Sequence, residues 1–196
     1  RDCGDIKHLL KPWLFRPWKS NDMLIEDCYQ PENNNIYFRG LLIPGVRDVI
    51  TCINDIGSPG VDIKGEKDTD YENKLQKARV GFSVSGIRDM CNRDVELWAA
   101  GIPFIRPRFT SKLMIDIPDD VYIPVDWEPN YNALTPIPTD KEKLAADIIN
   151  KFNEVKNDHE YLNQIGQNGY KFYKQHFTME KVIQNSFNIL LKEGLI

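Results

Sequence analysis

Short apolar segments alternate along this chain with segments of helical periodicity, and this alternation limits the folds that the chain can adopt. Strands are predicted at 35–40, 60–65, 79–85, 102–107 and 121–127, and helices between the first four strands at 46–57, 69–78 and 92–100. Strands that are apolar along their whole length must be covered on both faces, and strands separated by helices pair in parallel. The pattern therefore predicts an α/β fold built on a Rossmann-like, doubly wound parallel sheet.

The rest of the chain is predicted to be an irregular start and a helical end. A Pro-rich loop is predicted at 129–138. Three helical stretches follow at 140–157, 158–176 and 179–192, and the second of them is predicted to break near Gly166 and Gly169. The stretch 1–35 lacks periodicity and carries "KPWLFRPWKSND", so we predict an N-terminal arm or interdomain linker. Residues 36–196 then form one Rossmann-like domain with C-terminal helices.

Charge and cysteine content exclude several classes of protein. The net charge of −4 argues against a nucleic-acid partner, and no apolar run reaches the length of about 18 residues that a membrane span needs. The four cysteines form no CxxC pair, which argues against a zinc site; Cys3 and Cys28 could pair in an oxidising compartment. Without a signal peptide, a sequon or a clear disulfide pattern, a soluble and cytoplasmic protein is slightly favoured. The start at Arg1 without Met indicates an excised domain or a processed chain.

Polar and cationic residues follow three of the predicted strands. In a doubly wound sheet, ligands bind beyond the carboxyl ends of the strands, so these residues are expected on one edge: Arg39–Gly40, Ser85–Gly86 and Arg106–Arg108. The helix that begins near residue 92 offers unpaired N–H groups and a partial positive charge, which together favour phosphate. The plain alternative for this stretch is a strand-to-helix turn with solvated arginines.

A second strand-to-helix junction, "YFRGLLIPGVRD", adds Arg39 and Arg47 to the same edge. Two cationic loops on neighbouring strands suit a diphosphate, and glycine lets the backbone approach it closely. Glu96 lies three residues after Arg93 and could bind ribose hydroxyls, or it could simply pair with Arg93. Arg88 and Asp89 have no assigned role and are candidates for the acceptor side.

These residues carry a resemblance to a known class of enzyme. "ELWAAGIP" resembles the E-x-x-x-x-G-x-P signature in the C-terminal half of GT-B glycosyltransferases. Over roughly residues 36 to 192, the order and spacing of key residues are similar to those of the protein O-glucosyltransferase and capsule-associated glycosyltransferase family. The residues concerned are Phe38, Arg39, Gly40, Arg47, Gly86, Arg93 and Gly101.

The resemblance implies a GT-B donor-binding domain that helps move a sugar from a nucleotide-diphosphate sugar, expected to be a UDP-sugar, to a hydroxyl of a protein or glycan. It implies no metal and no other cofactor. The acceptor site and the catalytic base would belong to an N-terminal domain outside this chain, so no catalytic residue is assigned. The diphosphate ligands would be Arg39, Gly40, Arg47, Ser85, Gly86 and Arg93, with Glu96 at the ribose. A non-catalytic nucleotide-sugar-binding or glycan-binding module is the alternative.

Other motifs fit simpler explanations. Asp68 and Asp70 form a D-x-D pattern that could hold Mg²⁺ or Mn²⁺, but polar residues precede it, and a helix start at Thr69 with Glu72 in a capping box explains it sufficiently. The histidines have no Ser or Cys at a hydrolase spacing. The aromatic residues between 161 and 177 are expected to pack rather than to bind a ligand.

Overall fold

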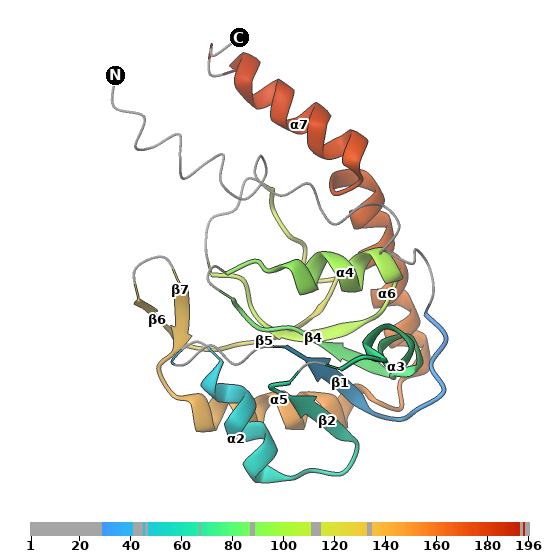
Figure 1. The fold of residues 1–196 in the computed structure, drawn as a ribbon, viewed down its shortest axis with the longest axis vertical. Coiled ribbons are helices and arrows are strands. Elements are labelled where there is room, and N and C mark those ends of the chain that lie inside the picture. Colours follow the sequence, from blue (N-terminus) through green and yellow to red (C-terminus); the bar gives the residue numbers. More distant parts are fainter. Residues whose placement is uncertain are drawn as a thin grey trace.

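The computed structural model describes residues 29–40, 45, 47–66, 68–86, 89–110, 115–132, 135–192 and 194. Within these ranges five short strands form one sheet in the order β2-β1-β3-β4-β5, and each neighbouring pair is parallel (Figure 1). The strands are β1 (Ile36–Arg39), β2 (Val61–Lys64), β3 (Val80–Phe82), β4 (Phe104–Pro107) and β5 (Ile123–Val125). The predicted parallel sheet is confirmed.

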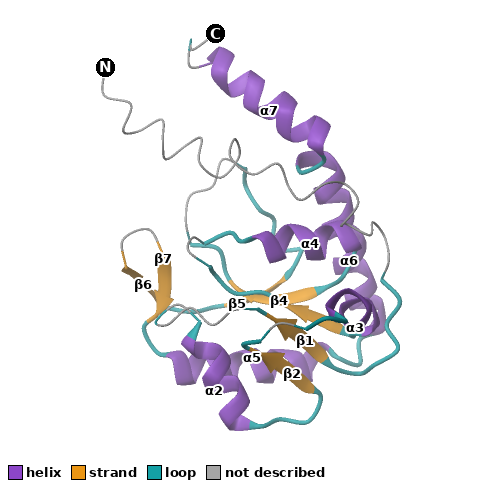
Figure 2. Ribbon diagram, in the orientation of Figure 1, coloured by secondary structure: helices purple, strands orange, loops and turns teal. Residues whose placement is uncertain are grey.

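Helices cover both faces of the sheet, as the doubly wound prediction requires. On one face lie α2 (Asp48–Ile56) and α5 (Lys141–Val155), below the sheet in Figures 1 and 2. On the other face lie α3 (Tyr71–Lys77), α4 (Asn92–Ala100) and the last turns of α6 (His159–His176). The chain ends in α7 (Met179–Lys192), which contacts α6. None of the helices in the described ranges has both the length and the apolar content needed to cross a membrane.

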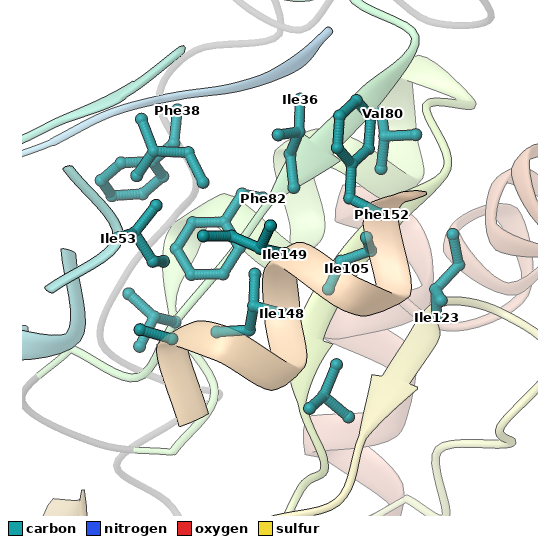
Figure 3. Packing of buried hydrophobic residues seen from close by; sticks show 14 of the residues in the cluster. Ile36, Phe38, Ile53, Val80, Phe82, Ile105, Ile123, Ile148, Ile149 and Phe152 are labelled. Carbon is teal, nitrogen blue, oxygen red and sulfur yellow. The ribbon is translucent and has the colours of Figure 1, made fainter. Parts of the chain in front are cut away.

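Successive side chains of a strand point to opposite faces of the sheet, and both faces are covered here, which explains why the strands are apolar throughout. Ile36 and Phe38 of β1 face the layer of α2 and α5, where they meet Ile53 and Phe152, as Figure 3 shows. Tyr37, the residue between them, belongs to the cluster on the opposite face. All these side chains are at most 2% exposed. Burial on both faces thus leaves no polar position within β1 until Arg39.

The predicted break in the helix at 158–176 is wrong, because α6 is a single helix of 18 residues. Its glycines mark a close approach to α4 instead. A Cβ atom on Gly166 would lie 2.3 Å from the carbonyl oxygen of Gly101, and one on Gly169 would lie 2.8 Å from Cδ1 of Trp98. No side chain fits at either distance, so glycine here allows two elements to pack rather than ending a helix.

The Pro-rich segment 129–138, predicted to be a loop, forms an antiparallel pair of strands, β6 (Pro129–Asn132) and β7 (Thr135–Pro138). Both strands are edges of a two-stranded sheet, where a proline without an N–H is tolerated.

The capping box predicted at Thr69 and Glu72 is also wrong. The helix α3 begins one residue after Asp70, whose backbone N–H donates to Asp68 Oδ1 at 2.9 Å.

Residues 1–28 of the predicted N-terminal arm lie outside the described residues, including Cys3 and Cys28, and so does Arg88. The end of that segment is attached to the domain at Tyr29, whose hydroxyl donates to the carbonyl oxygen of Arg79 at 2.8 Å. The division into residues 1–35 and 36–196 stays a prediction.

Candidate anion-binding site at the carboxyl edge of the sheet

The strand order creates a switch point between β1 and β3. From β1 the chain moves to β2 on one side, then crosses back to β3 on the other side. In doubly wound sheets, ligands bind outside the carboxyl ends of the strands at such a point. The helices that follow these two strands, α2 and α4, begin at this edge and lie on opposite faces of the sheet. The predicted diphosphate and ribose ligands all belong to these two junctions.

Arg47, just before α2, connects the two junctions. A Cβ atom on Gly40 would lie 3.1 Å from its Nη1, and one on Gly86 would lie 3.6 Å from its Nη2. Its Nε donates to the carbonyl oxygen of Ser85 at 3.4 Å. The guanidinium of Arg47 therefore lies against both glycines. A side chain at Gly40 would crowd it, whereas the distance at Gly86 is that of an ordinary van der Waals contact.

Arg93, in the first turn of α4, reaches the same region from the other face of the sheet. Its Nη2 donates to the carbonyl oxygen of Arg39 at 2.7 Å, and its guanidinium lies 4.2 Å from the centre of the Tyr71 ring. Its Nη1 lies 3.2 Å from Oε2 of Glu96. The pairing of Glu96 with Arg93 is thus formed in this structure, and a role of Glu96 at a ribose stays a prediction.

The electrostatics of this edge favour an anion. Burial lowers the pKa of Arg93; the carboxylate of Glu96 acts to raise it, and the like charge of Arg47 acts to lower it. Within the described part of the chain, Nε of Arg93 and the Oγ of Ser85 are buried without a hydrogen-bond partner, while Nη1 of Arg93 forms its ion pair with Glu96. A buried donor left without a partner costs about 1–3 kcal/mol. An anion placed between Arg47 and Arg93 would offset both the missing hydrogen bonds and the repulsion.

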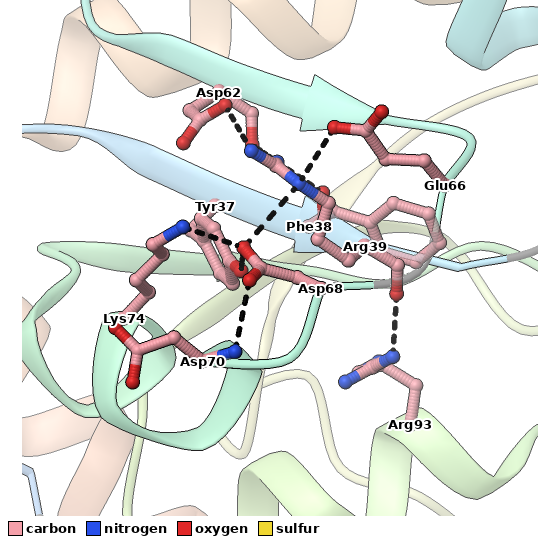
Figure 4. A network of polar contacts seen from close by, with 9 residues as sticks. All are labelled: Tyr37, Phe38, Arg39, Asp62, Glu66, Asp68, Asp70, Lys74 and Arg93. Atoms are coloured by element: carbon pink, nitrogen blue, oxygen red, sulfur yellow. Dashed lines mark hydrogen bonds and ion pairs between the residues drawn. The ribbon is translucent and has the colours of Figure 1, made fainter.

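The side chain of Arg39 lies apart from Arg47 and Arg93, although the backbone carbonyl of Arg39 contacts Arg93. Its Nη2 lies 2.7 Å from Oδ1 of Asp62, its Nη1 donates to the carbonyl oxygens of Phe38 and Asp62 at 2.9 Å, and its Nε lies 3.5 Å from Glu66 (Figure 4). The Arg39 side chain is 7% exposed. Its charge is therefore compensated by carboxylates of the β2 side, and its role as a diphosphate ligand stays a prediction.

The D-x-D pattern is used within the domain. Asp68 accepts hydrogen bonds from Lys74 Nζ at 2.8 Å, from the Asp70 N–H at 2.9 Å and from the Tyr37 hydroxyl at 2.9 Å (Figure 4). These hydrogen bonds hold the pKa of Asp68 well below its usual range, and the bond from Lys74 has the largest effect. Among the described residues, no group of three or more His, Cys, Asp or Glu side chains is placed to hold a metal ion.

The placement of Arg106 on the open edge is wrong. Its side chain is fully buried and pairs with Asp89 and Asp94. Asp89, a candidate for the acceptor side, is 2% exposed and belongs to the same buried network. Arg108 is partly exposed and pairs with Asp119 and Asp126. Arg106 and Arg108 are thus both held by carboxylates, apart from the two junctions where Arg47 and Arg93 lie.

Cys91, next to the start of α4, is not a candidate nucleophile. A helix N-terminus usually lowers the pKa of a cysteine. Here burial and the neighbouring carboxylate of Asp94 raise the pKa of Cys91 to about 12. The thiol therefore stays protonated at neutral pH.

Neither a protein-family model nor a curated protein matches the sequence. The chain is similar in structure to TarM, with a TM-score of 0.52, 10% identity, and coverage of 82% of this chain and 35% of TarM. It also matches the C-terminal domain of a glycosyl transferase group 1 family protein (LpcC) from Francisella tularensis, at 12% identity and a TM-score of 0.46, covering 77% of this chain and 89% of that domain. The fold is Rossmann-like. The chain spans about a third of the length of TarM, and at this identity the likeness concerns the fold alone.

Tyr71 is a residue of this edge that the sequence analysis missed. It begins α3, and its ring supports the Arg93 guanidinium. Its hydroxyl is buried without a hydrogen-bond partner in the described residues. The signal that was available is its position at the start of the helix that follows β2, which brings it to the same edge as the other junctions.

Proposed function

We propose that this chain is the donor-binding domain of a GT-B glycosyltransferase that moves a sugar from a nucleotide-diphosphate sugar to a hydroxyl of a protein or glycan. The observation that carries the proposal is the placement of two arginines at the switch point between β1 and β3, where Arg47 donates to the carbonyl oxygen of Ser85 and Arg93 donates to that of Arg39. The Ser85 hydroxyl is buried there without a hydrogen-bond partner among the described residues. The motif resemblance and the Rossmann-like fold support the proposal. A UDP-sugar is the donor that we propose.

In this proposal the guanidinium groups of Arg47 and Arg93 bind oxygens of the diphosphate, and the Ser85 hydroxyl donates to the same group. Arginine offers several N–H donors in a fixed plane, which suits phosphate oxygens. As the bond to the sugar breaks, negative charge grows on the departing diphosphate, and these fixed donors would stabilise it without a metal ion. Glu96 would exchange its contact with Arg93 for the ribose hydroxyls. The base and the acceptor site would come from another domain.

A non-catalytic nucleotide-sugar-binding module is the second candidate, because every contact described at this edge is one of binding. The two candidates differ in what the protein does to a bound donor. A glycosyltransferase with its acceptor domain present transfers labelled sugar from the donor to a hydroxyl acceptor, whereas a binding module leaves the donor intact.

The first test is calorimetric titration of the protein with UDP, GDP and their sugars, with uridine as the matched control that lacks phosphate. We expect saturable binding of at least one nucleoside diphosphate and binding of uridine at least about tenfold weaker, since each charge-assisted phosphate contact contributes about 1.5–3 kcal/mol. Added salt should weaken the diphosphate complex. If no nucleoside diphosphate binds, or if uridine binds as tightly, the proposed site does not exist.

A further inference from the structure

Arg106 is the centre of a charged network inside the domain. It lies in β4, and its side chain is 0% exposed. Its Nη2 donates to the backbone carbonyl of Asp89 at 2.8 Å and lies 3.2 Å from Asp89 Oδ1, while its Nε lies 3.3 Å from Asp94 Oδ1. Its guanidinium lies 3.4 Å from the centre of the Phe109 ring. The two carboxylates are themselves at most 2% exposed.

The partners of Arg106 belong to the segments that build the candidate site. Asp89 lies between β3 and α4, and its Oδ2 accepts from the N–H of Thr110 at 2.7 Å and from its hydroxyl at 3.2 Å. Asp94 lies in the first turn of α4, and its Oδ2 accepts from the Cys91 N–H at 2.7 Å. One guanidinium thus joins the segment after β3, the start of α4 and the segment after β4.

This network is a costly way to stabilise a fold. Burial raises the pKa of Asp94 even though Arg106 acts to lower it. Nε of Arg106 and Oδ1 of Asp94 form an ion pair at 3.3 Å without a hydrogen bond, and Nη1 of Arg106 has no hydrogen-bond partner among the described residues. Buried ion pairs of this kind can often be replaced by uncharged residues without loss of stability, whereas removal of one partner alone is strongly destabilising. The network therefore matters beyond stability through the backbone segments that it holds in place.

We infer that Arg106 is a positioning residue for the candidate site, which through Asp89 and Asp94 fixes the start of α4 and the segment before it. Arg93 lies directly before Asp94, and Ser85 and Gly86 lie in the segment that Asp89 anchors. Fixing these backbones sets where Arg93 and the Ser85 hydroxyl meet a ligand, and displacements of a fraction of an ångström weaken such contacts. The ligand part of this inference rests on the proposed function; the positioning does not.

Two variants separate positioning from stability. The triple variant Arg106→Met, Asp89→Asn, Asp94→Asn removes the charges together and keeps amide oxygens that can accept from Thr110 and Cys91. Arg106→Lys keeps the charge but loses the planar fork that reaches both carboxylates. Phe152→Leu, in the core on the opposite face of the sheet, is the matched control for a plain loss of stability. The measurements are thermal unfolding, hydrogen exchange resolved by segment, and UDP titration.

For the triple variant we expect a melting temperature close to that of the wild type, faster amide exchange confined to residues 89–94, and about tenfold weaker UDP binding, which is about 1.4 kcal/mol. Phe152→Leu should lower the melting temperature and leave both local exchange and UDP affinity unchanged. The inference is overturned if exchange at 89–94 stays as in the wild type, or if exchange rises uniformly as in the control. If the triple variant does not fold, Arg106→Lys decides by the same readouts. If the wild type binds no nucleotide, the proposed function fails, and local exchange alone still decides the positioning.

Discussion

Replacement of Arg93 by alanine is expected to weaken the binding of UDP or GDP by about tenfold to about 150-fold. The proposed contact joins a guanidinium to a phosphate oxygen, and a charge-assisted hydrogen bond contributes about 1.5–3 kcal/mol. Arg93 is mostly enclosed, with a side chain that is 15% exposed, so water replaces the lost contact poorly. Arg93→Lys should fall between the wild type and Arg93→Ala, because lysine keeps the charge and loses the planar fork.

Arg79→Ala is the matched control, since Arg79 directly precedes β3 and so lies at the opposite, amino edge of the sheet. Its UDP affinity should equal that of the wild type. Calorimetric titration of each variant gives the affinity, and thermal unfolding shows whether each is folded. Equal UDP affinities for the wild type and for folded Arg93→Ala would remove Arg93 from the site.

Replacement of Trp98 by alanine should lower the free energy of unfolding by about 3–5 kcal/mol, the cost of truncating a large aromatic in a core. Trp98 is 1% exposed, and its Nε1 donates to the carbonyl oxygen of Val121 at 2.7 Å. Its ring contacts those of Phe104, Phe109, Phe172 and Phe177. Alanine leaves a cavity at the contact of α4 with α6, which the closely packed glycines of α6 cannot fill by moving.

Urea unfolding followed by far-ultraviolet circular dichroism measures this loss. Trp98→Phe is the matched variant: it keeps an aromatic ring and removes the donor to Val121, so its loss should be clearly smaller. A loss below about 1 kcal/mol for Trp98→Ala, which is the range of an ordinary surface substitution, would contradict this account of the packing.

The architecture could be predicted because its signal is local. In a strand such as Ile36–Arg39, the three successive apolar residues before Arg39 indicate that both faces are covered, and that is visible in a few letters of sequence. The glycines of α6 were misjudged because the same residue ends one helix and lets another pack closely. Which of the two holds depends on Gly101 and Trp98, more than 60 residues away.

The arginines show the same limit more sharply. From sequence position alone, Arg39, Arg93 and Arg106 are all expected on the same edge of the sheet, Arg39 and Arg93 as diphosphate ligands. Arg39 pairs with Asp62 of β2 and Arg106 pairs with two buried aspartates, whereas Arg93 pairs with Glu96 of its own helix and lies close enough to Arg47 for their like charges to interact. The deciding partners are far apart in sequence, so only the three-dimensional arrangement separates structural arginines from those available to a ligand.

The most direct test of the central claim is the location of bound nucleotide on the sheet. In a titration of isotopically labelled protein with UDP, followed by amide chemical shifts in nuclear magnetic resonance spectra, the account predicts the largest changes at Gly40, Ser85, Gly86 and Arg93. Amides at the amino edge, such as those of Gly60 and Ala78, should keep their positions. Changes concentrated at the amino edge or on the β6–β7 pair, with none at Ser85 and Gly86, would contradict a diphosphate site between β1 and β3.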